Sequence, residues 1–310
     1  MVRLGIIHGI CLGERQTPDV EGFWKDFEDL LELTVQSLLF RFKHICSQSA
    51  KSAPFMYRNK SMRGGEYDSK TCVYDVMKHG SLAIGYIGVA EMCQAMFGKT
   101  HADGDKEVYD FALSVVKRIY DKAKESSEKY NLNFGSYASP SESLCKTVIY
   151  GNNEVRGMRD EFGIIPNVTD KDYVTNSHHV PVWKKVDVFT KLQLEAPFTS
   201  YVTSGCITYV ELDSGIVNNP KAIEQIIDYA FKELDIPYLA FNFPIDTCLD
   251  CGYQAEFNDE CPDCGSENIE QLRRVTGYLT TDYHKFNKGK QAEVKDRFKH
   301  STITDFNKEI

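Results

Sequence analysis

Residues 248–265, CLDCGYQAEFNDECPDCG, contain two Cys-x-x-Cys-Gly knuckles. Their cysteines are Cys248, Cys251, Cys261 and Cys264. Two such pairs predict one tetrahedral metal site, because each knuckle bends the chain so that two sulfurs converge on the same ion. The glycine after each pair, Gly252 or Gly265, permits the tight turn. We predict a structural zinc ion, with rubredoxin-like iron as one alternative and a disulfide framework as another.

The composition of the whole chain argues against the disulfide alternative. The chain has 310 residues, 10 cysteines and a net charge of -9 at pH 7. It shows no run of eighteen apolar residues and no signal peptide, so we expect a cytoplasmic protein with no membrane partner and with reduced thiols. The acidic balance argues against nonspecific binding to nucleic acid or anionic membranes. This length allows one large domain or two moderate ones.

Two further stretches follow the knuckles: 273–279, RRVTGYL, and 286–300, FNKGKQAEVKDRFKH. Together with the cysteines they resemble the C-terminal end of the anaerobic, class III ribonucleotide reductases. In that family the glycine of the R-V-x-G-Y-L motif carries a stable backbone radical, and the matching residue here is Gly277. Glycine suits this chemistry, because an α-carbon radical needs a planar centre that a β-carbon would crowd. The alternative interpretation of Gly277 is an ordinary turn glycine.

Apolar spacing in the rest of the chain predicts alternating strands and helices. Strands are expected at 4–10, 81–88, 131–138, 173–180 and 238–241, although the first run is short enough to be a helical turn. Helices are expected at 17–46, 73–78, 105–124 and 221–234, with another ending at Gly98. The helix at 17–46 is predicted to begin with Thr17 as its cap and Pro18 at its first position. Arg63-Gly64-Gly65 is interpreted as a loop.

The turn SPSES at 139–143 lies between an expected strand and an expected helix. Such a turn points free backbone N–H groups and the positive end of the helix dipole at one spot, which suits an anion. The plainer interpretation is a helix cap, with Glu142 as a first-turn acid. A similar turn cradles the substrate phosphates in ribonucleotide reductases. From that resemblance we assign Ser141, Glu142 and Ser143 to phosphate binding, mainly through main-chain amides.

Two adjacent histidines, His178 and His179, invite a metal or acid–base interpretation. On the strand expected at 173–180 they would face opposite sides, so they would not easily bind one ion together. We therefore expect no catalytic role for either. The family has a similar Thr-Asn-Ser-x-His stretch, but the resemblance assigns it no role.

The resemblance extends from Phe23 to His300 and implies an α/β fold. This fold is the second half of a ten-stranded α/β barrel followed by a zinc ribbon and a glycyl radical loop. We expect the partial barrel at 1–243 and the zinc and glycyl radical domain at 244–310. Residues 1–15 depart from the family pattern, and no Met-Gly-Cys-Arg type motif occurs. The other cysteines are expected to be buried small hydrophobes: Cys11, Cys46, Cys72, Cys93, Cys145 and Cys206.

The function implied by the resemblance is that of the C-terminal polypeptide of a split anaerobic ribonucleoside-triphosphate reductase, which makes deoxyribonucleotides for DNA synthesis. A separate N-terminal polypeptide would bring the thiyl cysteine, so this chain alone should not reduce nucleotides. The resemblance also implies an activating enzyme with S-adenosylmethionine and a [4Fe-4S] cluster, a ribonucleoside triphosphate substrate, and formate or a small dithiol protein as reductant. A homo-oligomeric assembly is expected.

Two hypotheses of other classes stay open. A zinc-ribbon protein that binds nucleic acid is suggested by residues 273–300, which hold eight Lys/Arg against three Asp/Glu. Interleaved stacking aromatics are missing there. The other hypothesis is an inactive remnant of a reductase, or a spare part that carries the radical for a damaged one.

Overall fold

The computed structural model describes residues 1–58, 73–257, 259–275 and 277–300. Its helical segments are α1 Val2–His8, α2 Val20–Cys46, η1 Ala50–Ser52, α3 Pro54–Arg58, α4 Tyr74–Met77, α5 Val89–Phe97, α6 Lys106–Tyr130, α7 Leu144–Tyr150, α8 Met158–Phe162, α9 Val188–Thr199, η2 Ser214–Asn218, α10 Pro220–Asp228, η3 Tyr229–Glu233, η4 Tyr283–Lys285 and α11 Lys288–Asp296. Its strands are β1 Ser81–Tyr86, β2 Asn133–Ala138, β3 Thr208–Glu211, β4 Leu239–Asn242, β5 Ile245–Cys248, β6 Gln254–Ala255, β7 Ile269–Val275 and β8 Tyr278–Thr280. The loop expected at Arg63-Gly64-Gly65, together with Cys72, lies outside the described residues.

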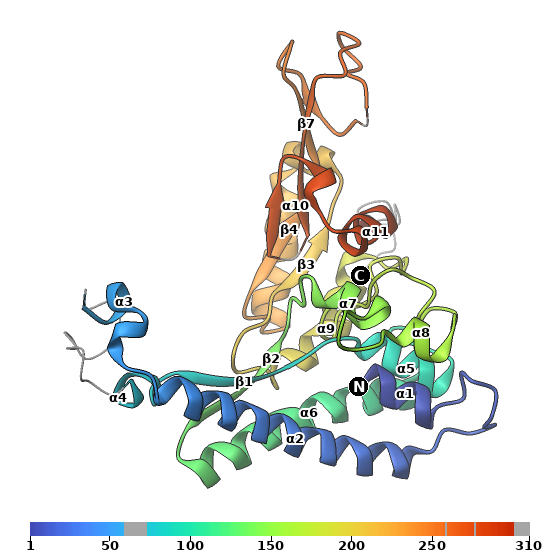
Figure 1. Ribbon diagram of the computed structural model, residues 1–310. Coiled ribbons are helices and arrows are strands. Elements are labelled where there is room, and N and C mark those ends of the chain that lie inside the picture. Colours follow the sequence, from blue (N-terminus) through green and yellow to red (C-terminus); the bar gives the residue numbers. More distant parts are fainter. Residues whose placement is uncertain (59–72, 258, 276, 301–310) are drawn as a thin grey trace.

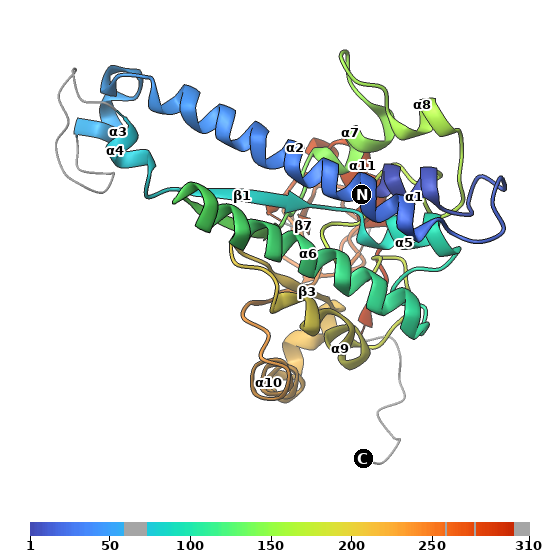
Figure 2. The ribbon, with the colours of Figure 1, turned by 90° about the horizontal axis from the view of Figure 1, so that it is seen from below.

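The strands β1 and β2 form a parallel pair, with Ser81 opposite Asn133 and Tyr86 opposite Ala138. The long helices α2 and α6 lie along this pair (Figures 1 and 2). A core of buried apolar side chains from these helices, from α5 and from both strands fills the space between them. The strands predicted at 81–88 and 131–138 are therefore confirmed, because a strand buried under helices needs an apolar sequence of this kind.

The helix α2 shows how the apolar spacing determines the local structure. Its buried residues recur every three or four positions: Phe23, Phe27, Leu31, Val35, Leu39, Phe42 and Cys46. The predicted end at Cys46 is confirmed, but the predicted start is two residues early. The cap is Asp19, whose carboxylate accepts a hydrogen bond from the backbone N–H of Gly22 at 2.9 Å. An acid at this position satisfies one of the free N–H groups of the first turn.

The second parallel pair joins β3 to β4, with Thr208 opposite Leu239. Helices α9 and α10 contribute Leu192 and Ile226 to a separate core that also holds Val210 of β3. The strand predicted at 238–241 and the helix predicted at 221–234 are confirmed, although the last part of that helix is the π-helical segment η3.

The C-terminal part is built differently, from an antiparallel sheet in the order β6-β5-β7-β8. In Figure 1, β7 rises from the body of the molecule toward the two knuckle loops, and α11 lies beside the body. Gly289 permits this close packing of α11. A β-carbon there would lie 2.8 Å from the carbonyl oxygen of Asp172 and 2.9 Å from Cβ of Lys146 of α7.

Three predictions of secondary structure need correction. The run at 4–10 is helical, in α1, and it packs so closely on α5 that a β-carbon at Gly5 would lie 2.7 Å from the carbonyl oxygen of Met92. The helix α1 is only seven residues long, which is too short for helical periodicity to be distinguished from a short apolar strand. The helix predicted to end at residue 124 continues to Tyr130. It ends at Asn131, which takes a left-handed conformation with φ 51°.

The strand predicted at 173–180 is absent from the described structure, and its backbone groups have other partners. The carbonyl oxygens of Thr175 and Ser177 accept hydrogen bonds from Gly88 and Val89 at the start of α5. Ser177 bends the chain with φ 41°. The apolar residues of this segment are buried although the segment is not a strand. A short apolar run was therefore misinterpreted as a buried strand.

The architecture is of the α/β class, with helices packed on two parallel strand pairs and an antiparallel module at the C-terminal end. The barrel and the division at residues 243 and 244 stay predictions. Within the described ranges, no helix has the length and apolar character needed to cross a membrane.

Candidate functional site

Each cysteine knuckle has the backbone geometry that its sequence predicts. The N–H of Gly252 donates to the carbonyl oxygen of Cys248, and the N–H of Gly265 donates to that of Cys261, both at 2.9 Å. Both glycines lie in the left-handed region, with φ 78° and 70°. Residues with a side chain rarely adopt this conformation, so the glycine in each motif is a structural requirement of the turn.

The two knuckles bring four sulfur atoms together, all within 4.8 Å of one another. The sulfurs of Cys248 and Cys264 are 3.6 Å apart, as are those of Cys251 and Cys261. The described cysteines are free thiols rather than disulfides. Two of the four are buried and two are exposed, which leaves one side of the cluster covered by the protein.

Charge also favours a cation at this cluster. The backbone N–H of Cys251 contributes most to lowering the pKa of Cys248, to about 6. The backbone N–H of Tyr253 acts in the same direction on Cys251, but burial and the three neighbouring thiols raise the pKa of Cys251 to about 12. Four thiolates this close would repel one another, and a divalent ion would remove that repulsion. The donor set and the spacing fit zinc.

Gly277 lies at the tip of the β7–β8 hairpin, in which Val275 pairs with Tyr278. A β-carbon on Gly277 would lie 3.2 Å from the Oε1 atom of Glu142, which is a tighter contact than most β-carbons make. The turn that contains Glu142 therefore lies directly against this glycine.

The SPSES turn lies next to this hairpin. Ser141 and Glu142 both have left-handed backbones, with φ 48° and 39°. Ser141 is buried and its hydroxyl contacts the side-chain oxygen of Asn176. The Glu142 carboxylate instead accepts a hydrogen bond from the Tyr278 hydroxyl at 3.0 Å. Ser143 is the cap residue of α7, but its side chain makes no capping hydrogen bond.

The amides predicted to bind phosphate are partly engaged within the turn. The N–H of Ser141 donates to the hydroxyl of Ser139, and the N–H of Glu142 donates to the carbonyl oxygen of Pro140. An incoming phosphate would replace these local hydrogen bonds. The thiol of Cys145 donates to the carbonyl oxygen of Glu142 at 2.9 Å, and burial raises the pKa of this thiol. The prediction that Cys145 is buried is confirmed.

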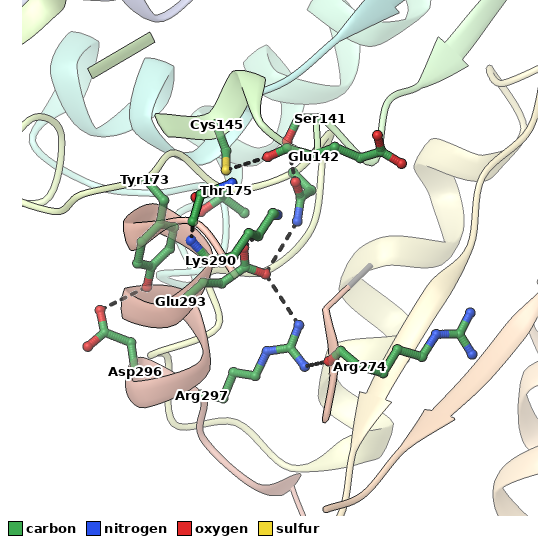
Figure 3. Close-up of polar contacts among 12 residues, drawn as sticks. Ser141, Glu142, Cys145, Tyr173, Thr175, Arg274, Lys290, Glu293, Asp296 and Arg297 are labelled. Carbon is green, nitrogen blue, oxygen red and sulfur yellow. Dashed lines mark hydrogen bonds and ion pairs between the residues drawn. The ribbon is translucent and has the colours of Figure 1, made fainter. Parts of the chain in front are cut away.

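The tail motif 286–300 forms a buried charge cluster on α11, shown in Figure 3. Lys290 is fully buried, and its ammonium lies 2.8 Å from Oε2 of Glu293. Arg297 donates to Oε1 of the same carboxylate at 3.3 Å. Burial alone would raise the pKa of Glu293, but the charges of Lys290 and Arg297 outweigh it and lower the pKa. Glu293 is therefore ionised inside the protein.

Arg297 also holds the strand that leads to Gly277. Its guanidinium donates to the carbonyl oxygen of Arg274 at 2.8 Å and pairs with Glu211 at 3.0 Å. Asn242 donates to the same carbonyl oxygen at 3.1 Å. Arg297, the residue that follows α11, thus contacts the base of the glycine hairpin.

The sequence singled out this tail motif but assigned no role to its side chains. Asn176 was missed as well. It contacts Ser141 of the turn and donates to Glu293 at 3.5 Å. The available signal was the set of three charged residues at positions 290, 293 and 297, which share one face of a helix.

The two histidines lie in the segment 173–180 and have separate partners. His178 is buried with a hydrogen bond of 2.7 Å to the Tyr86 hydroxyl, and burial lowers its pKa. His179 contacts the buried carboxylate of Glu195 at 3.1 Å, which also pairs with Lys191. These contacts give both histidines a structural role. Their predicted lack of a catalytic role remains a prediction.

Comparison with known proteins identifies relatives over nearly the whole chain. The family model for anaerobic ribonucleoside-triphosphate reductase matches residues 1–300. The expected departure at residues 1–15 is therefore wrong. The anaerobic ribonucleoside-triphosphate reductases of Escherichia coli and of phage T4 are 35% and 30% identical to it, over 91% and 88% of this chain. The chain spans 40% and 44% of their lengths.

Solved structures share the fold. An anaerobic ribonucleotide reductase matches with a TM-score of 0.70 and 20% identity, over 96% of this chain and 43% of that one. The anaerobic ribonucleotide reductase of Thermotoga maritima, solved with glycerol in its active site, matches with a TM-score of 0.63 and 21% identity, over 90% of this chain and 40% of that one. With the family match over residues 1–300, the chain belongs to the anaerobic ribonucleoside-triphosphate reductase family.

Proposed function

We propose that this chain is the radical-bearing part of an anaerobic ribonucleoside-triphosphate reductase, with Gly277 as the glycyl radical residue. The position of Gly277 carries the proposal. It stands in the R-V-x-G-Y-L motif, and a β-carbon on it would lie 3.2 Å from Oε1 of Glu142, in the turn assigned to the substrate phosphates. Glycine is needed there for chemistry, because only an α-carbon without a β-carbon can become planar in this hairpin without crowding.

The proposed reaction begins when an activating enzyme, using S-adenosylmethionine and a [4Fe-4S] cluster, removes one hydrogen atom from the α-carbon of Gly277. The glycyl radical then takes a hydrogen atom from a cysteine thiol, and the resulting thiyl radical takes the hydrogen from C3′ of the ribose. The thiyl cysteine belongs to the N-terminal part of the reductase, which we propose is a separate polypeptide. Formate or a small dithiol protein supplies the reducing electrons.

The chain's own residues have distinct parts in this scheme. Residues 244–310 form the zinc and glycyl radical domain, and Cys248, Cys251, Cys261 and Cys264 would hold the zinc ion that stabilises its fold. Residues 1–243 form half of a ten-stranded barrel, where the turn of Ser141, Glu142 and Ser143 receives the triphosphate, mainly through its main-chain amides. The assembly is homo-oligomeric and cytoplasmic.

The nucleic-acid alternative has less support. Several basic side chains in residues 273–300 form ion pairs within the protein. Arg273 pairs with Asp246, and Arg297 with Glu211 and Glu293. A surface for binding phosphate backbones needs basic groups available to the ligand.

The test is anaerobic electron paramagnetic resonance of this chain mixed with an N-terminal reductase fragment, the activating enzyme and S-adenosylmethionine. We expect a doublet that is lost in Gly277→Ala, and cleavage at residue 277 after exposure to air. Gly85→Ala is the control, because Gly85 lies outside the hairpin and a β-carbon there would have no neighbour closer than 3.7 Å among the described residues. An uncut chain without a doublet, with an activating enzyme shown to work on a full-length reductase, would favour the inactive remnant instead.

A further inference from the structure

The hairpin that carries Gly277 is held on both sides of the glycine. On the C-terminal side, the hydroxyl of Tyr278 donates to Oε2 of Glu142 at 3.0 Å, and Oε1 of the same carboxylate covers Gly277. On the N-terminal side, the carbonyl oxygen of Arg274 accepts hydrogen bonds from Asn242 and Arg297. Side chains that are distant in the sequence thus contact the hairpin on both sides of the glycine.

The two sides are connected to each other through the turn at 139–143. Ser141 contacts Asn176, which donates to Glu293 at 3.5 Å. Arg297 joins that carboxylate to the carbonyl oxygen of Arg274. Together with the Glu142–Tyr278 hydrogen bond, these contacts form a closed ring from one side of Gly277 to the other, which we call the hairpin ring: Tyr278, Glu142, Ser141, Asn176, Glu293, Arg297 and Arg274.

Two residues of the hairpin ring, both in the 139–143 turn, have an unfavourable backbone conformation. Two adjacent non-glycine residues, Ser141 and Glu142, both adopt left-handed conformations, which side chains disfavour. The result is that Ser141 reaches inward to Asn176, while the Glu142 carboxylate extends away from the Lys290–Glu293 pair (Figure 3). A carboxylate is also an unexpected group for holding a phosphate, since like charges repel. Its observed partner is the hairpin.

We propose that Glu142 is a positioning residue that couples the 139–143 turn to the Gly277 hairpin. Its hydrogen bond to Tyr278 holds the hairpin against the turn, so a phosphate bound at the turn and the position of Gly277 influence each other. A phosphate on the turn amides repels the Glu142 carboxylate and favours its orientation toward Tyr278. Linkage requires that this influence be reciprocal. The coupling rests on the proposed function, whereas the hydrogen bond itself is measurable without a radical.

The test is amide hydrogen exchange, followed by mass spectrometry, on the full zinc-loaded chain without radical or nucleotide. We expect exchange in the peptide 273–280 to become roughly three- to tenfold faster in Glu142→Ala and in Tyr278→Phe, the range for loss of one hydrogen bond. The double variant should lose little more than either single variant, because both remove the same contact. Glu142→Gln keeps an accepting oxygen and should retain most of the protection.

Exchange in the hairpin that is unchanged in both single variants would overturn the proposal. So would additive effects in the double variant, or exchange in Glu142→Gln that is as fast as in Glu142→Ala. Peptides from α6 provide the control for general unfolding, because this helix lies outside the hairpin ring. A loss of protection there as well would show that the variants act on the whole fold and would also contradict the proposal.

A second arm adds inorganic tripolyphosphate. In the wild-type chain we expect slower exchange in both the turn and the hairpin, and in Tyr278→Phe slower exchange in the turn alone. Slowing of both regions in Tyr278→Phe would show that coupling bypasses Glu142. If tripolyphosphate protects neither region, the phosphate assignment and the coupling are both wrong. If the wild-type chain gives a radical doublet and the variants show unchanged amide exchange in the hairpin, this inference is wrong and the proposed function is still supported.

Discussion

The cysteine cluster and the hairpin ring are both candidate functional regions, but they are assembled in opposite ways. The four cysteines lie within 17 consecutive positions, 248 to 264, and each pair is organised by its own tight turn. The hairpin ring instead joins residues as distant as Ser141 and Arg297. A local site can be recognised by its spacing, whereas a site made of distant residues exists only after the chain has folded.

The two regions also differ in what stabilises them. The cysteine module has a thin sheet and little apolar core, so its stability should depend on the metal. The hairpin ring is stabilised by buried charges that compensate one another on α11 and β3. Two perturbations separate these two sources of stability, and a third tests the part of the molecule outside both regions.

The largest effect is expected from Cys261→Ser. Removal of one of four ligands from a structural zinc site costs much of its binding free energy, which is roughly 10–16 kcal/mol in zinc-finger peptides. We expect the bound zinc to be lost and the segment 245–285 to become sensitive to proteases, while the core between α2 and α6 stays intact. Metal analysis and limited proteolysis are the measurements. Cys11→Ser, outside the cluster, is the control and should keep its zinc.

A smaller but substantial loss is expected for Arg297→Ala, which leaves Glu211 and Glu293 without their shared cation. Removal of one partner from a buried ion pair costs about 3–5 kcal/mol. The urea midpoint, measured by tryptophan fluorescence, should fall, with zinc retained. Lys295→Ala, at an exposed position on α11, is the control. Equal midpoints for the two variants would mean that the charge cluster contributes little to stability.

The smallest effect is expected in the pH dependence of the free energy of unfolding, through His101, which lies outside both regions. Burial lowers the pKa of His101 to about 4, so the folded chain binds this proton less tightly than the unfolded chain. The stability from neutral His101 is present above pH 6.5 and is lost as the pH falls toward 4. At pH 5.5 the loss is about 1.4 kcal/mol, from linkage with an unfolded pKa of about 6.5.

This loss should be smaller in His101→Gln, which cannot gain the charge. The free energy of unfolding is measured in urea at pH 7 and at pH 5.5 for both chains. The difference between their pH-dependent losses isolates His101, because the other titratable groups are the same in both chains. Parallel losses in the two chains would show that His101 is not responsible for this pH dependence.

Most of the long elements could be predicted from the sequence, because an apolar stripe favours a helix and an apolar run between polar flanks favours a buried strand. The helix α2 and the strands β1 and β2 are examples. The two failures have different causes. The helix α1 is only seven residues long, too short for a helical period to be recognised. The segment 173–180 is buried at every position except His179, so its apolar pattern indicates burial and does not distinguish the type of element.

The sequence by itself determined the four-cysteine cluster, because two knuckles with their glycines encode the turns that gather the sulfurs. It also pointed to Gly277 through a motif that resembles one family. Only the tertiary structure decided what surrounds that glycine: the Glu142 carboxylate, the buried Glu293 and Arg297 behind it, and the Asn176 that links them. The physical reason is that Glu142 meets the hairpin, and Asn176 meets Glu293, across more than a hundred residues of sequence. The local sequence of each segment does not indicate which partner folding will bring to it.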